Sequence, residues 1–180
     1  RSFPGNGVLS WDLPHDEPVD QYIYNPELPT NSRVETFCDR REVEIRSDVL
    51  TYTSEPLTTP LTILGDIELH LHAASDAPDT DWFVVLTEVT PDGQSRSFHY
   101  ALPSFRARYR DGFDKEVFLT PNKSEKFQIP MGPAGHQIAA GNCLRLSIFS
   151  AAFPEFDPNS NTGNPAATDT EMRVAKQTVF

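Results

Sequence analysis

The residues best suited to metal chemistry are three that alternate along one stretch. Glu68, His70 and His72 occupy every second position, so in an extended strand all three side chains lie on one face. Two imidazoles and a carboxylate are ligands that zinc accepts. The same spacing is produced by histidines on the solvated face of a strand, and we favour that interpretation.

A second group resembles the start of a calcium-binding loop. Asp157, Asn159 and Asn161 alternate in a polar segment. A calcium loop of the EF-hand type requires glycine at its sixth position and glutamate at its twelfth. Thr162 and Thr168 stand there instead. The sequence therefore predicts a turn-rich loop and no metal site.

Charged residues form two further groups. Asp79 and Asp81 could act as paired acids, but acid–base catalysis needs both to face one substrate, and nothing else in the chain completes a site. We predict a structural turn. Arg106, Arg108 and Arg110 would share one face of an extended stretch. They could bind an anion, but we favour pairing with the many carboxylates of the chain.

No nucleophilic site is evident. The chain contains no G-x-S-x-G elbow, which a serine nucleophile at a strand-to-helix turn requires. The five histidines cannot be placed in a Ser–His–acid set by spacing. We expect no catalytic residue, cofactor or metal in this chain. Cys38 and Cys143 are expected to be free thiols, because a domain built on disulfides would carry more cysteines.

Composition narrows the class of protein. The 180 residues carry a formal net charge of −11, and the basic patch typical of nucleic-acid binders is missing. We find no apolar run long enough to span a membrane and no signal peptide, and localisation stays open. The first residue is Arg1 and not Met, which suggests a processed product or a fragment.

The elements that must position these residues are predicted to be strands. Sixteen prolines and nine glycines spread along the chain disfavour long helices, and short apolar runs alternate with turns. Residues 82–89 are apolar on both faces, as in a central strand. Residues 64–72 alternate and should have one wet face. Further strands are expected at 43–52, 97–110, 126–131 and 143–150, with 170–180 as either helix or strand.

These runs predict an all-β jelly-roll sandwich. We place the sandwich at residues 31–180. Residues 1–30, rich in Pro, Asp and Glu, are predicted to be an extended arm that lies outside the core and links to another domain.

Several segments together resemble a known family. They are YIYNP, then DVLTYTSEPL through DTDWFVVLTEVTPDG, then FRARYR, then AGNCLRLSIFSAAFPEFDPNSNTG. In this order they are similar to the C-terminal non-catalytic domain of X-Pro dipeptidyl-peptidases and cocaine-esterase-like acyl hydrolases. The most specific segments contain Asp79, Asp81, Trp82, Phe153 and Asn161, to which we assign structural roles.

The resemblance implies a galactose-binding-like jelly roll that follows an α/β-hydrolase domain in the same polypeptide. That domain would hold the Ser–His–Asp triad. The sandwich would pack on it and help to shape the substrate pocket of an esterase or an X-Pro peptidase. The segment at residues 30–41 would reach that pocket, which makes Val34 and Phe37 candidates for its wall. The alternative for Phe37 is that it packs on this domain's own N-terminal arm. Relatives continue into a further strand, so we expect the last strand to be missing, with an exposed sheet edge that could support a homo-oligomer.

Two other functions remain open. A glycan-binding sandwich would present exposed aromatic rings, for which Trp11, Trp82 and Tyr109 are the candidates. The second alternative is a protein-interaction module without an enzymatic parent, which should expose no large apolar patch.

Overall fold

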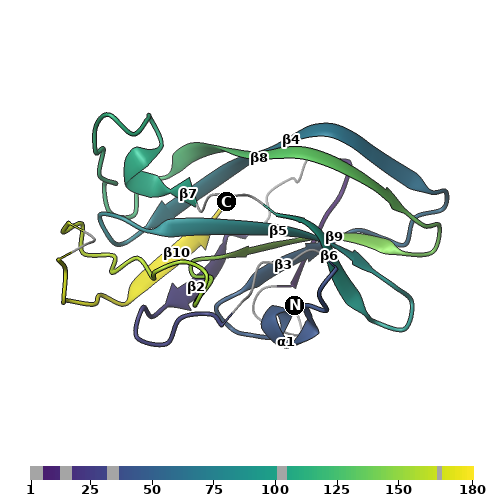
Figure 1. Ribbon diagram of the computed structural model, residues 1–180, viewed down its shortest axis with the longest axis horizontal. Helices are drawn as coiled ribbons and strands as arrows, with labels where there is room; N and C mark the ends of the chain where they lie inside the picture. Colours follow the sequence, from purple (N-terminus) through teal and green to yellow (C-terminus); the bar gives the residue numbers. More distant parts are fainter. Residues whose placement is uncertain (1–5, 13–17, 32–36, 101–104, 166–167) are drawn as a thin grey trace.

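The computed structural model describes residues 6–12, 18–31, 37–100, 105–165 and 168–180. Two sheets pack face to face, and this confirms the predicted all-β sandwich (Figure 1). One sheet has the order β1-β3-β9-β5-β6, with β7 paired to β5, and the other has the order β2-β10-β4-β8. The first contains β1 (Asn6–Val8), β3 (Leu50–Thr53), β9 (Cys143–Phe149), β5 (Asp81–Val89), β6 (Ser95–Tyr100) and β7 (Phe105–Arg106). The second contains β2 (Asp20–Tyr24), β10 (Ala175–Val179), β4 (Leu61–Ser75) and β8 (Glu125–Ile138).

Strand β5 is the centre of the first sheet, as its two apolar faces predict. It lies between β9 and β6, and every residue except Glu88 is buried. Trp82 faces the main core between the sheets, where it packs against Phe127 of β8. Phe83 faces the opposite side and stacks on Phe149 with ring centroids 5.6 Å apart. The strand therefore supports two apolar layers, one on each face of the sheet.

Strands β4 and β8 form a long antiparallel ribbon (Figure 1). The predicted strand at 64–72 is confirmed and extends further, to Leu61–Ser75. Leu71 points into the core, while His70 and His72 are exposed. On β8, Phe127, Ile129 and Met131 are buried, as their alternation predicts. Because β8 lies at the edge of its sheet, its prolines are placed where a missing N–H is tolerated.

The prediction of a strand at 43–52 is wrong for its first half. Residues Arg41–Glu44 form the short helix α1, and β3 begins only at Leu50. The alternation of Val43, Glu44 and Ile45 resembled a strand, but Glu44 is the buried residue and Ile45 is exposed. Glu44 turns inward because the sheet below offers hydrogen-bond donors to its carboxylate.

The prediction that residues 1–30 lie outside the core is also wrong in part. Strand β1 pairs with β3, and β2 pairs with β10. Tyr22 and Tyr24 of β2 belong to the main core, and the Tyr22 hydroxyl lies 2.7 Å from Ser150 Oγ. The sandwich therefore includes part of the N-terminal segment. At the other end, the segment left open between helix and strand contains β10. The missing last strand stays a prediction.

Candidate functional site

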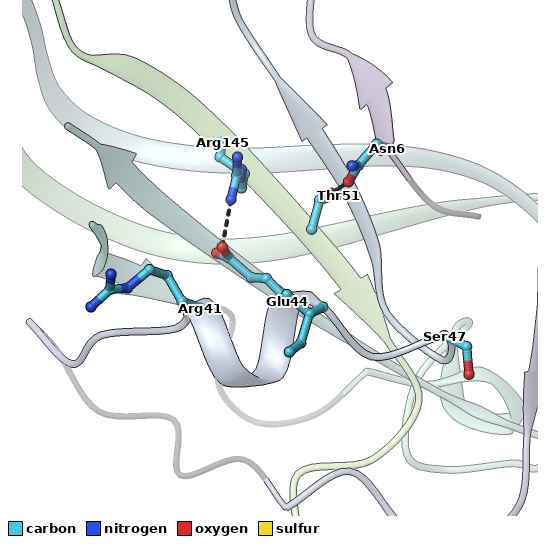
Figure 2. Close-up of a pocket in the computed structure, with 7 residues that line it drawn as sticks. Asn6, Arg41, Glu44, Ser47, Thr51 and Arg145 are labelled. Atoms are coloured by element: carbon cyan, nitrogen blue, oxygen red, sulfur yellow. Dashed lines mark hydrogen bonds and ion pairs between the residues drawn. The ribbon is translucent and has the colours of Figure 1, made fainter. Parts of the chain in front are cut away.

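A hollow lies on the outer side of the first sheet, beneath helix α1. Its volume is about 770 Å³. The lining residues come from β1, β3, β9 and the α1 segment: Asn6, Thr51, Arg145, Arg41, Glu44, Ile45 and Ser47 (Figure 2). We call residues 37–47 together with this hollow the α1 surface. It includes the candidate residue Phe37, which precedes the first residue of α1, Arg41, by four positions.

Phe37 is fixed by the backbone and presented to solvent. Its N–H donates to the Ser97 carbonyl of β6 at 2.5 Å, and the Ser97 N–H donates to the Cys38 carbonyl at 3.0 Å. These bonds add residues 37–38 to the free edge of β6. The side chain of Phe37 is 68% exposed, and its φ of 65° lies in the left-handed region, which bulky residues rarely adopt. Val34, the other candidate, lies outside the described residues.

Glu44 anchors α1 to the sheet. Its Oε1 accepts hydrogen bonds from Ser95 Oγ (2.7 Å) and Thr87 Oγ1 (3.3 Å). Its Oε2 accepts one from Arg145 Nη1 at 2.6 Å, drawn as a dashed line in Figure 2. The Glu44 side chain is 4% exposed and that of Arg145 23% exposed. This half-buried ion pair fixes the position of α1, and with it the orientation of the α1 surface.

Asp79 and Asp81, the candidate paired acids, belong to a structural hydrogen-bond network that contains no residue of α1. Asp81 receives two hydrogen bonds from Arg106, from Nε and Nη2, both 2.9 Å long. Asp79 receives bonds from the Arg108 backbone N–H (2.9 Å) and Nε (2.7 Å). Asn159 Nδ2 donates to both carboxylates, at 2.7 and 2.8 Å. Both acids are buried, so they join three chain segments and leave no open face for a substrate.

The electrostatics of this network follow from burial. Burial raises the pKa of the Asp81 carboxyl, and the hydrogen bonds and charge of Arg106 offset part of that effect. In turn, the hydrogen bonds to Asp81 raise the pKa of Arg106 above its ordinary value. The expected pairing of arginines with carboxylates is confirmed for Arg106 and Arg108. The expectation that they share one face with Arg110 is wrong, because β7 ends at Arg106 and a 3₁₀ turn, η1 (Ala107–Tyr109), follows.

Of the three residues of the calcium-like pattern, only Asn159 bonds to the Asp79–Asp81 network directly, and its Oδ1 accepts the Asn161 N–H at 2.9 Å. Asn161 has a φ of 62° and donates from Nδ2 to the Arg173 carbonyl at 2.8 Å. Asp157 is exposed and apart from the buried pair. Phe153 donates its N–H to the Thr30 carbonyl at 3.1 Å. Among the described residues, no group of three acidic, histidine or cysteine side chains could hold a metal.

The remaining candidates are dispersed. His70 contacts Glu68 on the exposed face of β4. Neither Cys38 nor Cys143 forms a disulfide bond with another described residue. Trp82 is 0% exposed, so it cannot stack on a sugar. Within the described part of the chain, no helix is both long enough and apolar enough to cross a membrane.

The sequence did not lead us to predict the ion pair between Glu44 and Arg145. One feature of the sequence could have indicated the position of Arg145. Leu144 and Leu146 face the core, so alternation places Arg145 on the opposite side of β9. Glu44 could not be identified as the partner of Arg145, because it was assigned to a strand at a position where the structure has helix α1.

Comparison with known proteins defines the class of this protein. The family described as the X-Pro dipeptidyl-peptidase C-terminal non-catalytic domain matches residues 12–179, so the chain belongs to that family. It is 30% identical over 174 residues to a cocaine esterase from Rhodococcus sp. (strain MB1 Bresler). The match covers 92% of this chain but 30% of the esterase.

Two solved structures of known proteins agree with this assignment to the family. An α-amino acid ester hydrolase superposes with a TM-score of 0.90 at 30% identity, over 97% of this chain and 32% of the other. An aminopeptidase from the marine sediment archaeon Thaumarchaeota archaeon also gives a TM-score of 0.90, at 27% identity, over 96% of this chain and 33% of the other. The chain thus spans about a third of the length of these relatives and is similar to their non-catalytic C-terminal domain.

Proposed function

We propose that this chain is the accessory C-terminal domain of a serine hydrolase of the acyl esterase or X-Pro dipeptidyl-peptidase type. It packs on an α/β-hydrolase catalytic domain of the same polypeptide and helps to shape the substrate pocket. The observation that carries this proposal is the coverage of the comparisons. The chain aligns over nearly its full length with only 30% of a cocaine esterase, within a family that is itself non-catalytic.

The α1 surface is the face that we propose to contact the catalytic domain. Its features suit a contact surface: Phe37 and Ile45 are apolar and largely exposed, and burying such side chains against a partner is favourable. The backbone bonds between residues 37–40 and β6 hold Phe37 in a left-handed conformation. Strained backbone of this kind is retained mainly where function requires it, which supports Phe37 as part of the pocket wall, with Val34 as its predicted neighbour.

Kinetics of the longer polypeptide test the role of Phe37. Phe37→Ala should change kcat/KM by about tenfold for at least one acyl group, the effect of a lost pocket contact. In this chain by itself, it should change the free energy of unfolding by less than about 0.5 kcal/mol, because the side chain is exposed there. Phe113→Ala is the matched control, since Phe113 is also largely exposed but follows η1 in the chain and packs against Tyr109. Equal substrate profiles for both variants and the wild type would refute the pocket-wall role.

A further inference from the structure

The hollow beneath α1 has a one-sided hydrogen-bonding character. Its carboxylate and amide oxygens already accept hydrogen bonds. The carboxylate of Glu44 receives hydrogen bonds from Ser95, Thr87 and Arg145. Asn6 Oδ1 receives one from Thr51 Oγ1 at 2.6 Å. A ligand that offers only donors would therefore find few free acceptors on these side chains.

The donors, in contrast, are in excess. Arg145 has five N–H groups. One binds Thr53 Oγ1 at 2.8 Å and one binds Glu44, and the other three have no hydrogen-bond partner among the described residues. The side-chain N–H groups of Asn6 and the hydroxyl of Ser47 likewise have no acceptor within the part of the chain that the structure describes. All three residues line the hollow.

The ligand that matches spare guanidinium and amide donors is a carboxylate. A planar guanidinium fork suits the two oxygens of a carboxylate group. Ile45, which is 82% exposed, adds an apolar wall for the methylene groups that carry such a carboxylate. Arg41 contributes less, because its side chain pairs with Asp39 and points away from Arg145 in Figure 2.

We propose that this hollow is a carboxylate-binding site, and that an acidic side chain of the catalytic domain fills it when the two domains pack. The choice of occupant rests on the proposed function. The chain carries a net charge of −11, which repels an acidic partner in general. The unpaired donors of Arg145 and Asn6 are therefore what would make an Asp or Glu contact favourable at this one place.

Titration of this chain with sodium acetate tests the site itself. Acetate replaces chloride at constant ionic strength, and NMR follows the Arg145 Nε–H and the Asn6 side-chain amide. We expect saturable shifts. Asn6→Asp keeps an oxygen to accept from Thr51 but replaces the amide donor with a negative charge, so it should weaken acetate binding about fivefold or more. Asn122→Asp is the matched control on an exposed turn and should leave binding unchanged.

The absence of saturable shifts would overturn the site, and so would equal affinities in Asn6→Asp and Asn122→Asp. The longer polypeptide, labelled with ¹⁵N-arginine, tests the occupant. There acetate should no longer shift the Arg145 Nε–H, because an acidic side chain already fills the hollow. Undiminished binding would overturn that assignment. If the native polypeptide is no longer than this chain, the proposed function and the occupant fail together, while the acetate titration still decides the site.

Discussion

Replacing Arg106 with methionine should destabilise the sandwich far more than breaking an exposed ion pair. Arg106 is a quarter exposed, but its partner Asp81 is 1% exposed and receives two hydrogen bonds from it. The variant leaves a buried carboxylate with Asn159 as its remaining side-chain donor among the described residues. Removing one partner of a buried pair costs about 3–5 kcal/mol. We expect about 3 kcal/mol, because water can enter at the exposed end of the vacated space.

The control is Arg41→Met. Arg41 and Asp39 form a pair of similar geometry, but both side chains are about half exposed. Such pairs contribute roughly 0–1 kcal/mol. Urea denaturation of both variants at pH 7, with equal m-values, gives the two free-energy changes directly.

The pH dependence of the Arg106→Met deficit has a defined sign. Burial raises the pKa of Asp81, and without Arg106 this effect is less opposed. An acid whose folded pKa lies above its unfolded value binds protons more tightly in the native state, so stability rises as pH falls through the folded pKa. The deficit should therefore shrink as pH falls from 7 toward the ordinary aspartate value of 3.8. A deficit below about 1 kcal/mol at pH 7, or one that grows on acidification, would refute this account of the network.

Two further predictions concern the buried side chain of Trp82 and the partly buried carboxyl of Glu88. Trp82→Ala should lower the free energy of unfolding, measured by urea denaturation, by about 3–5 kcal/mol because Trp82 is fully buried. Trp11→Ala, at an exposed site, should change it by no more than about 0.5 kcal/mol. Similar losses in the two variants would contradict the core assignment. Partial burial opposes ionisation of Glu88, but hydrogen bonds from Asn142, Ala139 and His136 outweigh it and hold the pKa of this carboxyl below its ordinary 4.5. The ionised Glu88 carboxyl therefore stabilises the fold above pH 4.5, and this stabilisation is lost as pH falls through the folded pKa. Glu88→Gln should cost about 1 kcal/mol at pH 7 and make the free energy of unfolding less dependent on pH on the acid side. An unchanged dependence on acid pH would contradict this.

The sequence predicts the centre of this fold well, because burial on both faces leaves a clear pattern. Residues 82–89 are apolar at successive positions, and the structure places them in the middle strand of a sheet. Residues 64–72 alternate, and the structure gives them one exposed face. The period of a strand is local information, so it can be read without knowing the partners of each residue.

The errors have one physical cause: partners far apart in sequence decide which residues are buried. Glu44 is turned inward by Arg145, and Tyr22 is drawn into the core by its pairing with β10. Neither partner is visible from a local pattern. For the same reason, Asp79 and Asp81 could be predicted as structural residues and Arg106 and Arg108 as partners of carboxylates, but the individual pairs could not be assigned.

The candidate site could be predicted only in outline. The resemblance pointed to the segment that contains Phe37, and the structure places this residue at the edge of β6, just before the α1 segment that lines a hollow. Nothing in the spacing of the sequence indicated the hollow, because it is formed by β1, β3, β9 and α1 together. A cavity between elements is a property of the tertiary structure, so it has no local signature.

The most direct test of the central claim is the size and reactivity of the native polypeptide that carries this sequence. An antibody to this domain is used to blot source cells, which are labelled in parallel with a serine-reactive fluorophosphonate probe. We predict a band much larger than 20.2 kDa that takes the label, as expected for an accessory domain joined to a serine hydrolase. A native band of 20.2 kDa that resists the probe would contradict the accessory-domain account.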